Sequence, residues 1–127
     1  MARIVVAEDD AHTLRIMVVW LTRHGHEVFE ARDGTSALAC VRQHRPDVLI
    51  SDVNMPGLNG VKLVRTCLEE LAEPFSVIVF TARCDRHVVQ QQLAGQPVQV
   101  FPKPFSPAML IEEIDKLTNR TQAEPVA

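Results

Sequence analysis

Five short apolar segments alternate along this chain with longer segments in which apolar residues recur at helical spacing. The apolar segments are strand candidates, and they lie at about residues 3–7, 27–31, 48–52, 76–81 and 98–101. The first, third and fourth are almost continuously apolar, which is typical of strands covered on both faces of a parallel sheet. The second alternates between apolar and polar residues, which favours a position at the edge of the sheet.

The segments between the strand candidates carry the apolar stripes of amphipathic helices. These stripes predict helices at about residues 13–24, 36–43, 60–71 and 86–94, with a last helix after residue 106. Asp10 is expected to cap the first helix, and Gly25 stands where helices commonly end. Ser106 is a preferred N-cap and Pro107 suits the first helical position, so the start of the last helix is well defined.

The alternation of strand and helix repeats five times, which predicts an α/β fold with right-handed crossovers and helices on both faces of the sheet. We expect a doubly wound (βα)5 domain of the flavodoxin-like kind, with five parallel strands in the order 2-1-3-4-5. In that order the topological switch point lies between the first and third strands. Ligands of such sheets bind beyond the carboxyl ends of the strands at this point.

The composition narrows the class of protein. The chain has 127 residues and a net charge of −3, which fits one domain over about residues 1–120 with a flexible tail over 121–127. An acidic balance argues against direct nucleic-acid binding, and no apolar run approaches the roughly 18 residues of a membrane span. Cys40, Cys67 and Cys84 form no CxxC pair, and the chain starts without a signal-peptide pattern. We therefore expect reduced thiols and a cytoplasmic location.

Acidic residues follow the two strands that border the switch point. Glu8 and Asp9 come directly after the first strand candidate, and Asp52 ends the third. Carboxylates brought together raise one another's pKa, and a divalent cation relieves that repulsion. Because the ligands are oxygens without a histidine or cysteine cluster, the expected metal is Mg2+.

The other strand ends supply partners for a phosphoryl group. An aspartate beside Mg2+, here Asp52, can attack phosphorus and become an aspartyl phosphate. Such a transfer depends on positioning and charge neutralisation. Lys103 after the fifth strand offers an ammonium, and Thr81 at the end of the fourth offers a hydroxyl, with the small Ala82 beside it leaving access. Pro56 and Gly57 are a turn signal that ends the strand of Asp52.

These motifs together resemble the receiver domain of two-component response regulators over about residues 3–120. The resemblance is close to the stand-alone receivers of chemotaxis. Any one motif is weak, but four of them in order on the expected strands are specific. They are Glu8-Asp9, Asp52 with Met55-Pro56-Gly57, Thr81-Ala82, and Lys103-Pro104-Phe105.

The resemblance implies a role for each acid. Asp52 would be the phosphoacceptor. Asp9 would bind Mg2+ directly and Glu8 through water. Asp52 would also be a metal ligand, and Asn54 would offer its backbone carbonyl to the metal. The domain would not be an enzyme beyond phosphorylating and dephosphorylating itself.

Other roles follow from the same resemblance. Thr81 would be the switch hydroxyl, and Lys103 would bind the phosphate and precede a cis peptide bond. Asn54 and Arg83 would tune the lifetime of the phosphoryl group. The family often has an aromatic residue three positions before the lysine, where this chain has Val100. Phe101 should face the other side of the sheet, so the usual coupling of threonine to an aromatic residue is in question.

The resemblance also implies partners. A sensor histidine kinase or phosphotransfer protein would supply the phosphoryl group. Phosphorylation would then switch binding of an unknown output protein at the face formed by the fourth helix, fifth strand and fifth helix. The domain would be a monomer or weak dimer, and the output would come from another protein or from a longer regulator of which this chain is a fragment.

Two other functions and one residue remain open. A haloacid-dehalogenase-type phosphatase shares the aspartate, threonine, lysine and Mg2+, but places its nucleophile after the first strand with an acid two residues later, where Asn54 stands here. A pseudo-receiver would have the fold without phosphorylation. Trp20, in an almost wholly apolar stretch, suits either ordinary packing or a partner surface.

Overall fold

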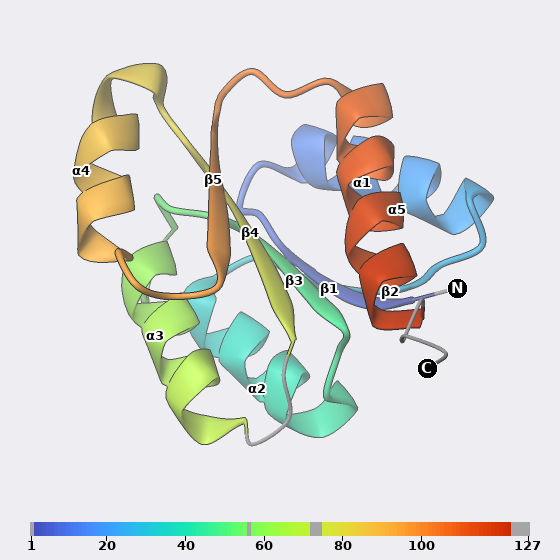
Figure 1. Ribbon diagram of the computed structural model, residues 1–127, viewed down its shortest axis with the longest axis horizontal. Coiled ribbons are helices and arrows are strands. Elements are labelled where there is room, and N and C mark those ends of the chain that lie inside the picture. The colour runs from blue at the N-terminus through green and yellow to red at the C-terminus, as the bar shows by residue number, and fades with distance from the viewer. Residues whose placement is uncertain (1, 56, 72–74, 123–127) are drawn as a thin grey trace.

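The computed structural model describes residues 2–55, 57–71 and 75–122. Within these residues, strands and helices alternate along the chain, with one short 3-10 turn (Figure 1). The strands are β1 Arg3–Ala7, β2 Glu27–Ala31, β3 Val48–Asp52, β4 Ser76–Thr81 and β5 Val98–Pro102. The helices are α1 Ala11–Arg23, α2 Gly34–His44, α3 Gly60–Glu70, α4 Arg86–Gln92 and α5 Pro107–Gln122, and the 3-10 turn is η1 Arg83–Asp85.

The strands form one sheet in the order β2-β1-β3-β4-β5, and all four pairs are parallel. This confirms the predicted flavodoxin-like topology. Strand β2, whose residues alternate between apolar and polar, lies at an edge of the sheet as predicted and pairs with β1. In the register, Ala7 of β1 pairs with Ser51 of β3, so the residues that follow each of them reach the same end of the sheet.

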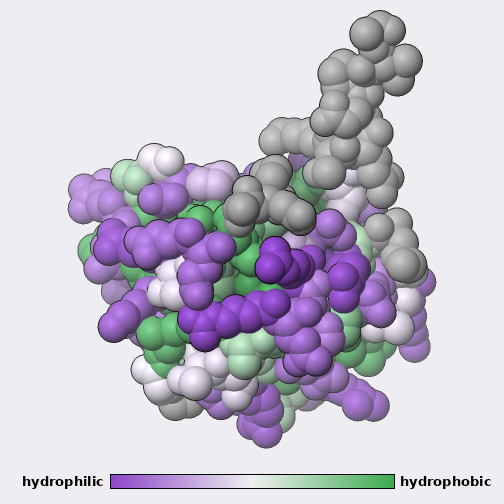
Figure 2. All heavy atoms as spheres, turned by 90° about the horizontal axis from the view of Figure 1, so that it is seen from below, coloured by the Kyte–Doolittle hydropathy of each residue, from purple (hydrophilic) through white to green (hydrophobic). Residues whose placement is uncertain are grey.

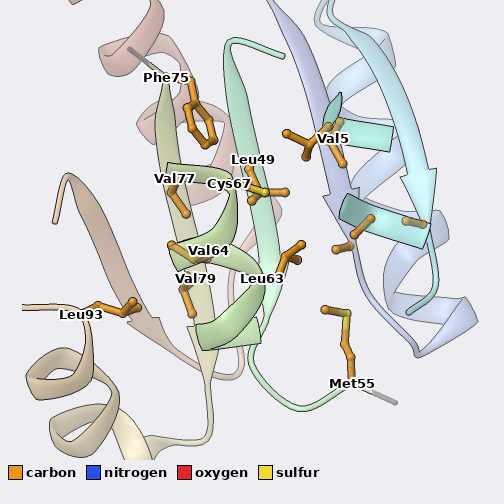
Figure 3. Packing of buried hydrophobic residues seen from close by; sticks show 14 of the residues in the cluster. Val5, Leu49, Met55, Leu63, Val64, Cys67, Phe75, Val77, Val79 and Leu93 are labelled. Carbon is orange, nitrogen blue, oxygen red and sulfur yellow. The ribbon is translucent and has the colours of Figure 1, made fainter. Parts of the chain in front are cut away.

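Two hydrophobic cores form on the two faces of the sheet. Because side chains alternate along a strand, Val77 and Val79 of β4 enter one core while Ile78 and Phe80 enter the other. The first core includes buried residues of α2, α3 and α4, and the second includes those of α1 and α5. Figure 3 shows α3 lying across the sheet with its buried side chains directed at the strands, among them Leu63, Val64 and Cys67.

Helix caps explain where the helices begin. The Asp10 side chain accepts a hydrogen bond from Thr13 N at 3.1 Å, which confirms it as the N-cap of α1. Asp33 accepts from Ser36 N at 2.7 Å in the same way. Helices α1 and α2 therefore each begin two residues before the start predicted from the apolar pattern, because the N-cap lies ahead of the apolar stripe.

Other boundaries also differ from those expected. Helix α4 ends at Gln92, before the predicted residue 94, and α5 continues to Gln122, two residues into the segment expected to be a tail. Residues 123–127 lie outside the described residues, as does Pro56 of the predicted turn. Gly57, next to Pro56, has a φ of 77°, the left-handed conformation that glycine adopts readily.

The surface is mainly polar, and Trp20 and Val88 are the large hydrophobic residues exposed among the described residues. Figure 2 shows the molecule from below, where hydrophilic side chains surround a smaller number of hydrophobic ones. Trp20 is 38% exposed and stacks on His24 with ring centroids 6.2 Å apart. Ordinary core packing was the wrong alternative for this tryptophan. Among the described helices, none is both long enough and apolar enough to cross a membrane.

A buried histidine makes folding stability depend on pH. His26 accepts a hydrogen bond from Ala2 N through Nδ1 at 3.0 Å, and its buried Nε2 has no hydrogen-bond partner among the residues that the structure describes. Burial, with the nearby N-terminal charge, lowers the pKa of His26 below its ordinary value of 6.5. The unfolded chain therefore takes up this proton before the folded one does, and stability is lost as the pH falls below about 6.5.

We expect His26→Gln, which keeps an acceptor for Ala2 N but does not titrate, to gain stability relative to the wild type as the pH is lowered from about 7.5 to about 5.5. The comparison of urea midpoints isolates His26, because Glu8, whose pKa is raised to about 7, is present in both proteins and has the opposite effect over this range. The matched control is His12→Gln, because His12 is exposed. A difference between the midpoints of the wild type and His26→Gln that does not change with pH would contradict this assignment.

Candidate functional site

Three carboxylates meet at the carboxyl ends of β1 and β3. Glu8 and Asp9 directly follow β1, and Asp52 is the last residue of β3. One carboxylate oxygen from each lies within 4.8 Å of the other two. Glu8 and Asp52 are buried, at 1% and 4% exposure, while Asp9 is exposed. The structure therefore brings together the acids that the sequence predicted as metal ligands.

Lys103 completes the charged cluster. Its Nζ lies 3.0 Å from Asp52 Oδ2 and 3.8 Å from Glu8 Oε1. Partial burial disfavours the charged lysine, but the hydrogen bond and charge of Asp52, with the charge of Glu8, outweigh this and raise the pKa of Lys103. The ammonium thus stays charged beside Asp52. The peptide bond from Lys103 to Pro104 is cis, as the resemblance implied.

Glu8 is a buried acid whose charge the cluster only partly balances. Burial is the main effect that raises the pKa of Glu8 to about 7, and the charge of Asp52 adds to it, against a lowering hydrogen bond from the Asp10 amide. Its Oε2 accepts that hydrogen bond at 3.1 Å, while its buried Oε1 has no hydrogen-bond partner in the described part of the chain. A buried carboxylate whose second oxygen has only a distant ammonium beside it, and whose pKa is raised, is a ligand that a divalent cation would stabilise in its charged form.

Thr81 lies on the neighbouring strand at the same level. In the sheet register, Asp52 pairs with Phe80, so Thr81 is one residue beyond. Thr81 is fully buried, and its Oγ1 has no hydrogen-bond partner among the described residues. Buried hydroxyls are usually hydrogen bonded. We therefore expect the Thr81 hydroxyl to gain a hydrogen-bond acceptor when a ligand binds at the charged cluster.

The backbone around Asp52 is tightly packed. Asn54 N donates a long hydrogen bond of 3.4 Å to Asp52 Oδ1, and Gly60 N donates to Val53 O at 2.8 Å. A Cβ at Gly60 would collide with the Asp52 carbonyl, so only glycine lets α3 start this close to the end of β3. The start of α3 thereby fixes the position of the nucleophile candidate.

Val100 and Phe101 of β5 point to opposite faces of the sheet, as predicted. Val100 pairs with Val79 and packs with the core under α2, α3 and α4. Phe101 packs with the opposite core, where its ring lies 6.1 Å from that of Phe80. Phe101 therefore does not lie on the face where the aromatic residue of the family would couple to Thr81.

One contact at the site was not predicted from the sequence. Arg32, directly after β2, donates a hydrogen bond from Nη2 to the carbonyl oxygen of Asp9 at 3.1 Å. Glu8 N also donates a hydrogen bond to Ala31 O at 3.0 Å. Two hydrogen bonds therefore connect Glu8 and Asp9 to the end of β2. The available signal was the position of Arg32 at the carboxyl end of the strand beside β1. Arg83, expected to tune phosphate lifetime, is exposed in η1.

Comparison with known proteins agrees with this geometry. Residues 4–115, most of the chain, match the response regulator receiver domain. The chain belongs to the response regulator receiver domain family. This receiver domain is 31% identical over 123 residues to the DNA-binding response regulator MtrA of Mycolicibacterium paratuberculosis, covering 97% of this chain and 54% of MtrA. It therefore spans about half the length of that relative.

Solved receiver structures share the fold. The receiver domain of Francisella response regulator 1452 has a TM-score of 0.83 at 25% identity, covering 95% of this chain and 99% of that one. The chemotaxis response regulator CheY4 of Vibrio cholerae has a TM-score of 0.77 at 27% identity, covering 92% and 98% of the two chains. This receiver domain is thus similar both to part of a longer regulator and to a single-domain one.

Proposed function

We propose that this receiver domain accepts a phosphoryl group on Asp52 from a sensor histidine kinase or phosphotransfer protein in the cytoplasm, in a Mg2+-dependent reaction. The observation that carries the proposal is the position of Asp52. Its buried carboxylate lies within 4.8 Å of those of Glu8 and Asp9 and 3.0 Å from the Lys103 ammonium. An oxygen nucleophile, a cation and a cluster of metal-binding acids are the components that phosphoryl transfer requires.

Each side chain has a defined task in this proposal. Glu8, Asp9, Asp52 and the Asn54 carbonyl would hold Mg2+, which would supply charge neutralisation for the phosphoryl oxygens. An Asp52 oxygen attacks phosphorus, and the bond from phosphorus to the donor breaks with its electron pair leaving on the donor. Lys103 then pairs with a phosphoryl oxygen, and Thr81 Oγ1 donates to another, which gives the unpaired hydroxyl its partner.

The phosphorylated state would act on a partner at the face formed by α4, β5 and α5. Three observations support this surface. β5 is the free edge of the sheet beside β4, its residues are half-buried, and Val88 of α4 is 52% exposed. Movement of Thr81 towards the phosphate would be transmitted first to η1 and α4, which follow it in the chain.

Phosphorylation is tested by incubating the protein with acetyl phosphate and measuring intact mass. We expect one phosphoryl group per chain in the presence of Mg2+, none with a chelator, and removal of the adduct by hydroxylamine, which reacts with acyl phosphates. An adduct that forms equally without a divalent cation, or no adduct at all, would contradict the proposed function.

The proposed surface is tested by hydrogen exchange. We expect the phosphorylated protein to change its amide exchange mainly in α4, β5 and α5, and little in α1 and α2. Changes confined to α1 and α2 would refute this choice of face.

Arg83 is expected to control how long the phosphoryl group lasts. Its exposed guanidinium, two residues after Thr81, can cover or pair with a phosphoryl oxygen and limit the approach of water. An Arg83→Ala variant should therefore lose phosphate severalfold faster, as followed by intact mass after acetyl phosphate is removed. Arg86→Ala, which removes an exposed charge nearby in α4, should keep the wild-type rate, and unchanged decay in Arg83→Ala would refute the role.

A further inference from the structure

A groove with an apolar lining lies directly beside the phosphoacceptor cluster. It has a volume of about 450 Å3 and is lined by Thr13, Ala82, Arg83, Lys103, Pro104 and Phe105. Lys103 belongs to both places, because the same residue has its Nζ 3.0 Å from Asp52. The groove therefore adjoins the phosphoacceptor cluster through Lys103, while Glu8, Asp9 and Asp52 are not among its lining residues.

The walls of the groove differ from the acidic cluster. Pro104, Phe105 and Ala82 offer carbon surface, while Lys103 and Arg83 provide two positive charges. Phe105 is held firmly, because its ring packs against that of the fully buried Phe80 with centroids 4.8 Å apart. Such a groove fits a ligand with an apolar body and an anionic group at one end.

A small phosphodonor of this description is an acyl phosphate. Its phosphoryl group carries the negative charge, and its acyl chain is the apolar body. During transfer to Asp52, the leaving carboxylate stays beside the phosphoryl group on the side away from the nucleophile. Lys103 would face the phosphoryl group of such a donor, and the carbon walls of the groove would face its acyl chain.

We infer that this groove binds the leaving group of small acyl phosphate donors, and that the domain prefers donors with a longer acyl chain than acetyl phosphate. This inference rests on the proposed function. An Asp52 oxygen bonds to phosphorus, the bond from phosphorus to the acyl oxygen breaks, and its electron pair leaves on the carboxylate. No proton is transferred in this step, because Asp52 attacks as a carboxylate and the acyl group leaves as one.

The test compares acetyl, propionyl, butyryl and hexanoyl phosphate as donors, with labelling rates measured by intact mass in the presence of Mg2+. These donors have leaving carboxylates of similar basicity, so a difference in rate reports on binding of the chain. A fully buried methylene changes a rate constant about fourfold. Two half-buried methylenes should therefore make butyryl phosphate about fourfold faster than acetyl phosphate. The rate should level off once the chain fills the groove.

Variants locate the effect. Phe105→Ala removes a wall of the groove and should bring the ratio of the butyryl rate to the acetyl rate close to one. The matched control is Phe101→Ala, which removes a ring that also packs near Phe80 but does not line the groove, and it should keep the ratio. If Phe105→Ala does not fold, the series of chain lengths in the wild type decides alone.

The outcomes separate the two proposals. Absence of labelling by every donor contradicts the proposed function itself. Labelling by acetyl phosphate with equal rates for all chain lengths, or a butyryl preference that Phe105→Ala leaves intact, overturns the inference about the groove.

Discussion

The Asp52→Asn variant is expected to take up no phosphoryl group from acetyl phosphate and Mg2+, and to be more stable than the wild type without metal. The amide has no charged oxygen to attack phosphorus, so the loss of labelling should be complete. Stability should rise because the substitution removes a buried charge that repels Glu8, whose free oxygen lies in the same cluster. Intact mass measures the first effect and the urea midpoint the second.

A second measurement on this variant separates the two effects. Mg2+ should raise the thermal midpoint of the wild type more than that of Asp52→Asn, because one of three clustered carboxylates is gone. The control is Asp47→Asn, which changes an aspartate that bonds Arg3 N at the other end of the sheet. Phosphorylation of Asp52→Asn to the wild-type extent would exclude Asp52 as the acceptor.

Lys103→Met is expected to lower both the rate of phosphorylation and the stability of the metal-free protein. Removing one preorganised cation from a site of charge transfer typically slows the reaction about a hundredfold. The metal-free protein should become less stable, since Asp52 and Glu8 remain buried without their cationic partner. The loss should be smaller than for a fully buried pair, because Lys103 is 38% exposed and water screens its charge.

Adding Mg2+ to Lys103→Met tests whether its loss of stability is electrostatic or comes from a general disturbance of the fold. Mg2+ should restore most of the stability that Lys103→Met loses, because it supplies positive charge to the same carboxylates. Lys116→Met removes an exposed lysine that pairs with Glu112 and Glu113 of α5, and should change neither the labelling rate nor the stability appreciably. Wild-type labelling by Lys103→Met would remove lysine from the proposed mechanism.

Much of the fold was predictable from the sequence, because the strands are buried on both faces. Runs such as Val48 to Ser51 do not alternate between apolar and polar residues. This pattern is typical of strands in a parallel sheet that helices cover on both faces. The switch point then places Asp52 beside Asp9 without further information, since both follow neighbouring strands at the same end. The acid cluster was therefore a consequence of topology.

The remaining features depend on distances that a sequence pattern does not contain. The contact from Arg32 to the Asp9 carbonyl requires a side-chain direction, and the groove beside Lys103 requires the mutual placement of three segments. Trp20 was ambiguous for another reason. Its stretch of α1 is apolar on nearly every side, so helical periodicity alone did not indicate which residue would face solvent.

The most direct test of the account is to identify the residue that carries the phosphoryl group. The protein is labelled with acetyl phosphate and Mg2+, reduced with borohydride, which converts an acyl phosphate to an alcohol, and digested for peptide sequencing by mass spectrometry. We predict homoserine at position 52 and unmodified aspartate at positions 9 and 10. Homoserine at either of those positions, with Asp52 intact, would contradict the claim that Asp52 is the phosphoacceptor.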